Sequence, residues 1–491
     1  IFQEGPDLPE ELEYDQAVAK LFALSEKTNL RNSFIGDLLP AWKTHPIADS
    51  VSKLRPLTTS YTPYQPERSQ GTLVTHWIYQ CALSALTGFE AINTSLYDRS
   101  AALFEAIACA IRTNPRGTRI LLAGSLFDED REVLHTLVRE TEIEFAIAPV
   151  NPFSGRLDFS ALESMEEEAT KGFAAFVFPQ VNKFGLLEKV DDLADFARER
   201  GMRSVACIDP MLLAGGGLKP PTEFGKEGVD FIAGEAQHLA IPPNFGGPGL
   251  GLFGCRFNER SKRDLRSTPG RYVGKAMDVN GRDCFVMVLS TREQHIRKEK
   301  ATSNVCSNQA FLATLAGASL LAKGEKGMKE SLEQALERKE KALEGILTCE
   351  GVELAFPESP SFNEVVLELD SEVPGLLAKG REANLHLGVD VSGRERAHEG
   401  RNLLKLTFSD LHDEEAVEEL IRFFNMEFPG LKKEESAYDP HPLAPEFLRD
   451  GPANLPSFSH DELSHYYEQL ADLNVSPDDG CYPLGSCTMK Y

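Results

Sequence analysis

Two polar side chains, Asp209 and Gln237, follow successive apolar runs of the sequence, where strand ends are expected. Asp209 directly follows the run 204–208, and Gln237 lies 237 − 209 = 28 residues further along the chain. An aspartate at a strand end can keep the ring nitrogen of a bound heterocycle protonated, so that the ring accepts electrons from a carbanion. A downstream lysine would hold the aldehyde of such a ring as a Schiff base. No lysine occurs in the stretch 227–261, so the chain has the aspartate and lacks the anchor.

Each of these features also has an ordinary structural explanation. Asp209 precedes a proline and could be a simple turn residue, which is the more frequent role of such an aspartate taken alone. The stretch Gly246-Gly-Pro-Gly249 is by itself only a turn signal. The two features occur together at a fixed spacing between expected strands. We therefore interpret Asp209, Gln237, Gly246 and Gly247 as a vestigial cradle for a cofactor.

The elements that would position this cradle alternate between short apolar runs and amphipathic patterns from about residue 71 to residue 320. The expected strands are Arg119–Ala123, Ile143–Ala148, Phe173–Phe178, Ser204–Ile208, Asp230–Ile232 and Leu250–Phe253. The expected helices are Thr72–Leu86, Ser100–Arg112, Arg131–Arg139 and Asp191–Arg200. Strands separated by helices of this length predict right-handed crossovers and a mostly parallel sheet that is covered on both faces.

A second, smaller α/β domain of about 100 residues is expected after this sheet. It would contain a charged amphipathic helix at Met328–Leu347, strands at Glu364–Leu369, Leu385–Val391 and Leu403–Phe408, and a helix at His412–Phe424. The predicted fold class is α/β. A large sheet domain joined to a small α/β domain suits several enzyme superfamilies, among them the aspartate-aminotransferase-like, fold type I group that uses pyridoxal phosphate. Topology alone does not choose among them.

Composition excludes several other classes of protein. The chain has 491 residues, which is more than one hydrophobic core usually serves, and a net charge of −25, which argues against nucleic-acid binding. No apolar run reaches the roughly 20 residues of a membrane-spanning helix. The nine cysteines are odd in number and scattered, which favours reduced thiols and a cytoplasmic location. Cys481 and Cys487 form the one close pair, for which two local thiols are a more probable role than zinc or redox regulation, and no metal site is expected.

One segment combines prolines, which impose an extended backbone, with tyrosine, glutamine and glutamate side chains: Tyr61-Thr-Pro-Tyr-Gln-Pro-Glu-Arg-Ser-Gln-Gly71. This motif closely resembles the glycine dehydrogenase (decarboxylating) family, the P-protein of the glycine cleavage system. Further matching segments are Thr87-Gly88, Asn93-Thr-Ser-Leu-Tyr-Asp98, Gly234-Glu-Ala-Gln237, Phe245-Gly-Gly-Pro248, Arg292-Glu-Gln-His-Ile-Arg297 and Lys300-Ala-Thr-Ser-Asn304. Residues 1–430 resemble the first subunit of the two-subunit form.

Residues 455–491, which close with Gly480-Cys-Tyr-Pro-Leu-Gly-Ser-Cys-Thr-Met-Lys-Tyr491, resemble the beginning of the second subunit. We therefore expect a fragment of a fused chain, cut at both ends. Two stretches depart from the family pattern: 179–185 matches it loosely, and the linker around 430–455 has no clear counterpart. The expected domains are an N-terminal helical region and extended arm (1–70), a large domain (71–325), a small domain (326–430), a linker (431–456) and the truncated second-half domain (457–491).

The resemblance implies an activity and its partners. Glycine would lose its carboxyl group as carbon dioxide, and the aminomethyl group would pass to the lipoyl arm of the H-protein. Pyridoxal phosphate would be anchored by a lysine in the missing second half, with which this half would pair pseudo-symmetrically, as a heterotetramer or as a dimer of fused chains. The segment alone would be inactive. The alternative is a non-catalytic half that only stabilises its partner and docks the carrier.

The resemblance also implies where the substrate and the lipoyl arm would enter. The candidate entrance residues are Tyr61, Thr62, Tyr64, Gln65, Glu67 and Gln70, joined by Ser486, Cys487 and Lys490 from the last loop. Interface packing is an equally probable role for each of them. His295 and Arg297 could contact an anionic group, although His295 is at least as well explained as a structural histidine. Lys490 lies outside the sheet that carries Asp209 and is therefore not expected to form a Schiff base.

Overall fold

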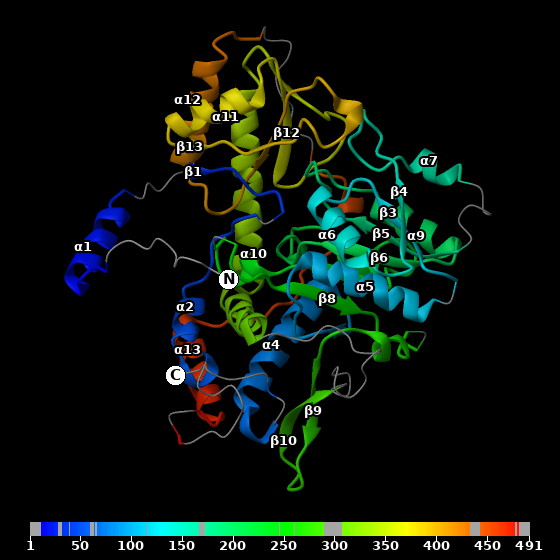
Figure 1. Cartoon of the computed structure of the whole chain (residues 1–491), viewed down its shortest axis with the longest axis vertical. Coiled ribbons are helices and arrows are strands. Elements are labelled where there is room, and N and C mark those ends of the chain that lie inside the picture. Colours follow the sequence, from blue (N-terminus) through cyan, green and yellow to red (C-terminus); the bar gives the residue numbers. More distant parts are fainter. Residues whose placement is uncertain are drawn as a thin grey trace, which may run out of the picture.

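The computed structural model describes residues 11–27, 32–38, 40–58, 63, 66–114, 116–165, 172–244, 246–259, 261–288, 307–432, 442–476 and 479–480 (Figure 1). Within them lie a large sheet domain, a smaller domain and a long helix, α10, that runs between the two (Figure 1). The expected fold class is confirmed in its layers and in its mostly parallel sheet.

The large domain is built on a seven-stranded sheet with the order β2-β8-β7-β6-β5-β3-β4. Its strands are β2 (Ala91–Ile92), β3 (Arg119–Ala123), β4 (Glu144–Ala148), β5 (Phe173–Pro179), β6 (Arg203–Ile208), β7 (Phe231–Glu235) and β8 (Gly251–Cys255). The strands from β4 to β7 pair in parallel, whereas β8 is antiparallel to β7 and β2 is antiparallel to β8. All seven residues of β5 are buried, as a strand covered on both faces requires.

The helices of this domain are α4 (Gln70–Thr87), α5 (Arg99–Thr113), α6 (Asp128–Val138), α7 (Phe159–Glu163) and α9 (Val190–Glu199). The four expected helices are confirmed with shifts of one to three residues at their ends. Short 3₁₀ helices connect the elements: η1 (Pro66–Arg68), η2 (Pro210–Leu213), η3 (Pro221–Glu223), η4 (Gln237–Leu239), η5 (Asp264–Ser267), η7 (Arg396–His398) and η9 (Pro445–Phe447). η2 and η4 directly follow β6 and β7, so they determine how side chains leave the sheet edge.

The small domain has a four-stranded antiparallel sheet with the order β11-β12-β15-β14. Its elements are α10 (Ser307–Ile346), β11 (Val352–Leu354), β12 (Glu364–Leu369), α11 (Val373–Glu382), β13 (Leu385–His386), β14 (Val389–Asp390), β15 (Leu403–Thr407) and α12 (Glu414–Glu427). The predicted single strand Leu385–Val391 is wrong, because the chain is interrupted between β13 and β14. Gly388 has φ of 152° there, and a Cβ on it would lie 2.2 Å from the carbonyl oxygen of Lys405.

Two further differences from the sequence-based expectation concern α10 and a hairpin. The helix predicted at Met328–Leu347 is only the second part of α10, which is interrupted at Gly324 (φ 55°). The hairpin of β9 (Tyr272–Met277) and β10 (Asp283–Val288) was not predicted, although Asn280-Gly281 between the strands is a typical hairpin turn. It extends away from the sheet in Figure 1.

The two ends of the described chain contribute short elements to both domains. They are α1 (Tyr14–Ser25), β1 (Asn32–Ser33), α2 (Ile47–Ser52), α3 (Arg55–Thr58) and α13 (His460–Asp472). β1 pairs with β13 of the small domain. α13 buries Leu463, Tyr467, Leu470 and Ala471 and packs on α2, α3 and α4. Ala453, Leu455, Leu463, Tyr467 and Ala471 thus belong to the core of the large domain, and the domain boundaries given above stay a prediction.

A search of the described helices finds none that combines the length and the apolar character needed to cross a membrane.

Acid should destabilise this fold through His76, a buried residue of α4. Burial lowers the pKa of His76 to about 4, and its hydrogen bond with the carbonyl of Ala310 (3.2 Å) opposes this only in part. Between the unfolded pKa of about 6.5 and pH 4, the unfolded chain binds a proton that the folded chain does not. The free energy of unfolding should therefore fall as the pH decreases through this window, by about 3 kcal/mol from this residue.

Urea denaturation of the His76→Gln variant at several pH values checks this expectation, because glutamine can still donate to Ala310 but does not titrate. The slope of its free energy of unfolding against pH should be smaller than that of the wild type. The difference should correspond to about one proton bound on unfolding. The control is His135→Gln, a change at an exposed histidine of α6. Parallel curves for the wild type and His76→Gln would contradict the assignment.

Candidate functional site

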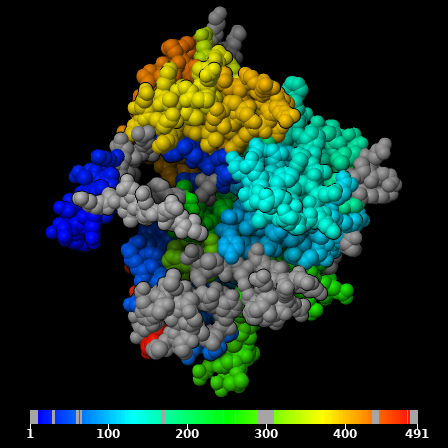
Figure 2. Space-filling view, in the orientation of Figure 1, coloured from blue at the N-terminus to red at the C-terminus, as the bar shows by residue number. Residues whose placement is uncertain are grey.

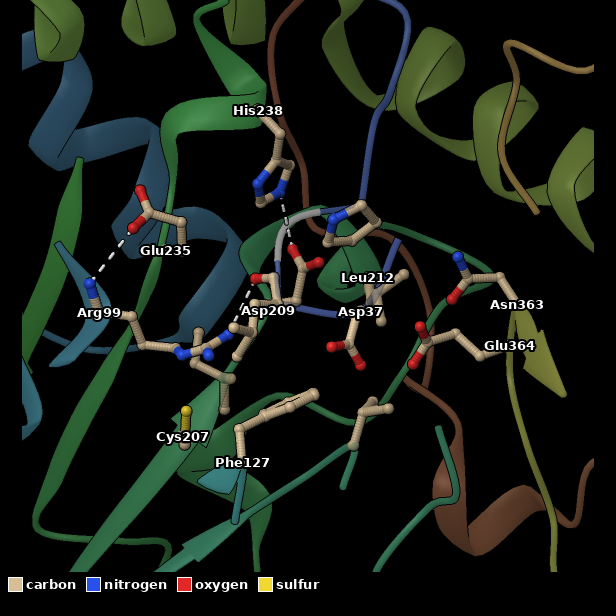
Figure 3. Close-up of a pocket in the computed structure, with 14 residues that line it drawn as sticks. Asp37, Arg99, Phe127, Cys207, Asp209, Leu212, Glu235, His238, Asn363 and Glu364 are labelled. Carbon is tan, nitrogen blue, oxygen red and sulfur yellow. Dashed lines mark hydrogen bonds and ion pairs between the residues drawn. The ribbon is translucent and has the colours of Figure 1, made fainter. Parts of the chain in front are cut away.

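A small cavity lies at the carboxyl ends of the parallel strands, the edge at which open α/β sheets usually bind ligands (Figure 3). Its volume is about 50 Å³. Segments far apart in the sequence meet there, and the lining residues are Asp37, Leu38, Pro40, Arg99, Phe127, Val181, Cys207, Ile208, Asp209, Leu212, Glu235, His238, Asn363 and Glu364. The cavity is thus enclosed by both domains and by the N-terminal arm.

Asp209, which directly follows β6, is hydrogen-bonded within its own chain. One carboxylate oxygen, Oδ1, accepts a hydrogen bond from the backbone nitrogen of Met211 (2.8 Å) and lies 2.9 Å from Nε2 of His238 (Figure 3). The His238 side chain is only 2% exposed. A ring nitrogen thus already faces the aspartate, and it belongs to a histidine of the chain. The sequence-based interpretation did not identify His238, although it directly follows Gln237.

Gln237, the residue predicted to replace the lysine, does not line the cavity. Its side-chain amide donates to the carbonyl oxygens of Pro242 (2.7 Å) and Ile241 (3.4 Å). The 3₁₀ turn of η4 therefore directs Gln237 toward the following loop and His238 toward Asp209. Gly246 and Gly247 are exposed and lie outside the cavity lining, and Gly246 has φ of 75°, which fits a turn.

Glu235, the last residue of β7, occupies the amino-terminal end of α5. Its carboxylate accepts hydrogen bonds from the backbone nitrogens of Arg99 (3.2 Å), Gln237 (3.0 Å) and Leu250 (2.6 Å). The N-terminus of a helix is a favourable site for phosphate groups because its backbone N–H groups are free to donate. Here the Glu235 carboxylate already accepts from one of these groups, the backbone N–H of Arg99, while Asp98 caps the helix by accepting from Ala101 (2.7 Å).

The opposite side of the cavity holds a buried ionic cluster, the Asp37 cluster (Asp37, Glu364, Arg394 and Lys405). Asp37 from the N-terminal arm is bridged by Arg394 (2.6 Å) and Lys405, and Lys405 also lies 3.3 Å from Glu364. Burial alone would raise the pKa of Asp37, but the two cations hold it below its usual value. Burial raises the pKa of Glu364, and the neighbouring Asp37 adds to this effect. The small-domain cations are thus neutralised within the chain.

These contacts do not fit bound pyridoxal phosphate. The aspartate already has a ring nitrogen as its partner, the helix N-terminus already has an anion, and none of the lining residues is a lysine. The cavity is also far smaller than the roughly 300–1,000 Å³ of typical cofactor sites.

Most of the predicted entrance residues lie outside the described part of the chain. These are Tyr61, Thr62, Tyr64 and Gln65 of the first segment, Ser486, Cys487 and Lys490 of the second, and also His295 and Arg297. Glu67 is exposed in η1. Gln70 begins α4, and its side-chain amide exchanges hydrogen bonds with both backbone groups of Phe285 in β10 (2.9 and 3.0 Å). Gln70 thus attaches the β9–β10 hairpin to α4. Neither Glu67 nor Gln70 lines the Asp209 cavity.

The described residues next to the two entrance segments lie side by side. The backbone nitrogen of Val475 donates to the carbonyl of Arg68 (2.9 Å), and Ser69 and Asn474 form an antiparallel bridge. The Asn474 amide bonds the backbone nitrogen (3.2 Å) and the hydroxyl (2.8 Å) of Thr72. Arg68 and Ser69 are therefore held against Asn474 and Val475 at the start of α4.

The described residues contain no group of three His, Cys, Asp or Glu side chains suited to a metal ion. The cysteines among them, Cys81, Cys109, Cys207, Cys255, Cys284 and Cys349, are free thiols. Burial raises the pKa of Cys207, the one cysteine that lines the cavity, to about 12, so its thiol stays protonated at neutral pH.

Comparison with known proteins shows which family this chain resembles in sequence and fold. Residues 2–420 match the family described as "Glycine cleavage system P-protein". The chain is 41% identical over 329 residues to the probable glycine dehydrogenase (decarboxylating) subunit 1 of Methylococcus capsulatus and 39% identical over 311 residues to that of Nitrosospira multiformis. These alignments cover 66% and 63% of this chain, and 70% and 66% of the relatives.

Among solved structures, the inhibitor-bound glycine decarboxylase (P-protein) of the glycine cleavage system superposes with a TM-score of 0.76 at 30% identity. It covers 87% of this chain and 92% of the other. A NifS-like protein superposes with a TM-score of 0.59 at 11% identity, over 82% of this chain and all of the other, which shows the shared fold alone. This is the fold type I architecture of pyridoxal-phosphate enzymes. Together with the sequence match over most of its length, it shows that the chain belongs to the glycine cleavage system P-protein family.

Proposed function

We propose that this chain is the half of a glycine dehydrogenase (decarboxylating) that lacks the cofactor lysine. The complete enzyme would break the bond between the carboxyl and methylene carbons of glycine and release carbon dioxide. The electron pair left on the methylene carbon would form a bond to one sulfur of the lipoyl disulfide on the H-protein. The other sulfur would keep the electrons of the broken S–S bond and take up a proton. Pyridoxal phosphate would be bound by the second half or subunit.

The observation that carries this proposal is the Asp209 cavity, in which Asp209, Glu235 and Asp37 already have partners within the chain and none of the lining residues is a lysine. A chain with the family motifs and without a usable cofactor site can contribute to the reaction only by completing a site on a partner. The contact of Arg68 and Ser69 with Asn474 and Val475 supports this role, because it joins a residue range near the first entrance segment to one that precedes the second.

The alternative function is a scaffold that stabilises the partner half and binds the carrier without contributing to the pocket. The contacts in the Asp209 cavity fit this alternative as well as the first function, because they argue only against a cofactor on this chain. The two functions differ in the entrance residues, which matter for turnover in the first and only for assembly in the second.

The test uses the chain alone and the chain combined with the second half. Alone, it should show no internal-aldimine absorbance with added pyridoxal phosphate and no borohydride-reducible lysine adduct. With the second half, glycine–bicarbonate exchange should appear. Tyr61→Phe and Tyr64→Phe should then lower exchange about tenfold or more while association is retained.

Tyr466→Phe is the matched control, because Tyr466 is an exposed tyrosine on the outer side of α13. A lysine adduct on this chain would refute the proposed division of roles. Full exchange in both tyrosine variants would leave the scaffold as the function.

A further inference from the structure

Residues 442–476 form an arm, the 442–476 arm, that lies along the large domain and contains α13. In Figure 1 α13 lies beside α2 and α3, and in Figure 2 the red end of the described chain meets the blue elements from its beginning. The arm is longer than the roughly 20–30 residues that each side of a stable protein–protein interface contributes. Its contacts with the large domain are therefore extensive enough to resemble an interface between two proteins.

The first contact of the arm is with the loop that follows η2. The backbone nitrogen of Lys219 donates to the carbonyl of Phe447 (2.9 Å), and the backbone nitrogen of Arg449 donates to the carbonyl of Gly217 (3.0 Å). These two hydrogen bonds make an isolated antiparallel bridge. The arm is thus paired through its backbone with a loop next to the carboxyl edge of the sheet.

The Arg449 side chain completes the C-terminus of α4. The last carbonyl groups of an α-helix have no partner within the helix, and a cation near them is favourable. The Arg449 guanidinium donates to the carbonyls of Leu86 (3.0 Å) and Ala85 (2.9 Å), which lie in the last turn of α4. The carbonyls at this helix end therefore have their hydrogen-bond partner in the arm.

The arm also fills the interruption of α10 at Gly324. In an uninterrupted helix, the backbone nitrogen of Glu325 would donate to the carbonyl of Leu321. Here the Glu325 nitrogen donates to the carbonyl of Leu455 (3.2 Å), and the Leu321 carbonyl accepts from the nitrogen of Phe458 (3.1 Å). Both backbone groups that the interruption frees are thus bound by the arm.

The side chain of Glu325 joins the arm to the loop after η2 at the same place. Its carboxylate accepts hydrogen bonds from the backbone nitrogens of Gly215 (3.0 Å) and Ala453 (3.1 Å). Gly324 has no room for a side chain, because a Cβ on it would lie 2.5 Å from Cβ of Ser457. The interruption of α10 therefore has the shape and the hydrogen-bonding groups that this occupant requires.

α13 supplies the apolar part of the contact. It buries Leu463, Tyr467 and Leu470, and it packs on α2, α3 and α4. The approach is close, since a Cβ on Gly71 of α4 would lie 1.8 Å from the carbonyl oxygen of Leu470. Burial of large apolar side chains is the main favourable contribution to association.

We propose that the 442–476 arm is the element by which the second half is bound to this half, and that it stays bound without a covalent link to residues 1–432. The inference rests on the proposed function, which supplies the second half, and on the resemblance of residues 455–491 to its beginning. A covalent link adds only effective concentration, whereas the contacts themselves provide the affinity. The large-domain surface therefore takes the arm of a second half, whether this belongs to the same chain or to a separate subunit.

The test cuts the folded chain between the small domain and the arm. A protease recognition sequence is inserted between Glu435 and Ser436, which lie outside the described residues, and complete cleavage is verified on a denaturing gel. At micromolar concentration, the C-terminal fragment should co-elute with the rest of the chain in size-exclusion chromatography. Elution of the fragment by itself from the cleaved wild type would overturn the inference.

Two pairs of variants examine the contacts in the cleaved chain. Tyr467→Asp/Leu470→Asp places two carboxylates on the buried side of α13, and Tyr466→Asp/Leu473→Asp places them at positions that are 41% and 53% exposed. We expect the first variant to raise the dissociation constant of the fragment at least about a hundredfold and the control to change it less than about threefold. Equal retention of the fragment in both would contradict the α13 contact.

A milder substitution applies if the double variant does not fold. Arg449→Met removes the hydrogen bonds to the end of α4 and should weaken binding of the fragment about tenfold. Arg422→Met, at an exposed arginine of α12, is its control and should leave binding unchanged. Unchanged binding in both would show that the arm does not depend on this contact and would overturn its role as the binding element.

The complete enzyme, cut at the same place, separates this inference from the proposed function. If the halves stay associated in the wild type and separate in Tyr467→Asp/Leu470→Asp, but no glycine–bicarbonate exchange occurs, the proposed activity is refuted and the arm contact stands. If exchange occurs and the halves associate equally in the double variant and its control, the arm contact is refuted and the proposed activity stands.

Discussion

Asp37→Asn should lower the free energy of unfolding of the chain by about 3–5 kcal/mol, because it leaves two buried cations without their shared counter-ion. Lys405 is fully buried and the Arg394 side chain is only 10% exposed, so water cannot replace the carboxylate. Asparagine has the same shape and tolerates the φ of 53° at this position, so the loss measures the charge and not the backbone. Urea denaturation at neutral pH gives the difference directly.

Asp49→Asn is the matched control for this substitution. Asp49 pairs with Lys53 at 2.6 Å, but its side chain is 70% exposed and the ion pair lies on the surface of α2. Such pairs contribute at most about 1 kcal/mol. Similar losses at the two positions would show that the Asp37 cluster is hydrated in solution and does not hold the N-terminal arm in the cavity.

The second large effect is expected from Asn474→Ala. The substitution removes hydrogen bonds to the backbone and hydroxyl of Thr72 and to the carbonyl of Pro56. Since Asn474 is buried, we expect a loss of about 2–3 kcal/mol in stability. We expect Asn474 to act as a positioning residue, because it ties the described chain that precedes the last loop to Thr72 and Pro56. Exchange activity with the second half should therefore fall roughly 10- to 100-fold.

Kinetics at a temperature where the variant stays folded separate positioning from stability. A positioning role predicts a higher KM for the H-protein together with a lower kcat, whereas loss of stability alone would reduce only the amount of active enzyme. Gln469→Ala is the control, because Gln469 is exposed on α13 and bonds only His465 (2.9 Å). Equal activity of the two variants would place the last loop away from the substrate entrance.

The order of elements could be predicted because a strand that is buried on both faces is a continuous run of apolar residues, which can be recognised in the sequence. The run Phe173–Phe178 is apolar throughout and forms the central part of β5, and the helices on either side were placed to within a few residues. The predictions were wrong where short irregular turns intervene. Gly388 divides one expected strand, and the β9–β10 hairpin has interior glycine and lysine residues that weaken its apolar pattern.

The sequence by itself determined the fold class, the family and the absence of a lysine from the stretch 227–261, because each depends on residue identity and spacing along the chain. Only the tertiary structure decided which side chains fill the cavity. The direction of a side chain after a strand depends on the local turn, so η4 turns His238 inward and Gln237 away. Asp37 reaches Arg394 across 357 residues, and such a distant ion pair leaves no periodic signal. Packing, which brings distant residues together, therefore decided which side chains line the cavity.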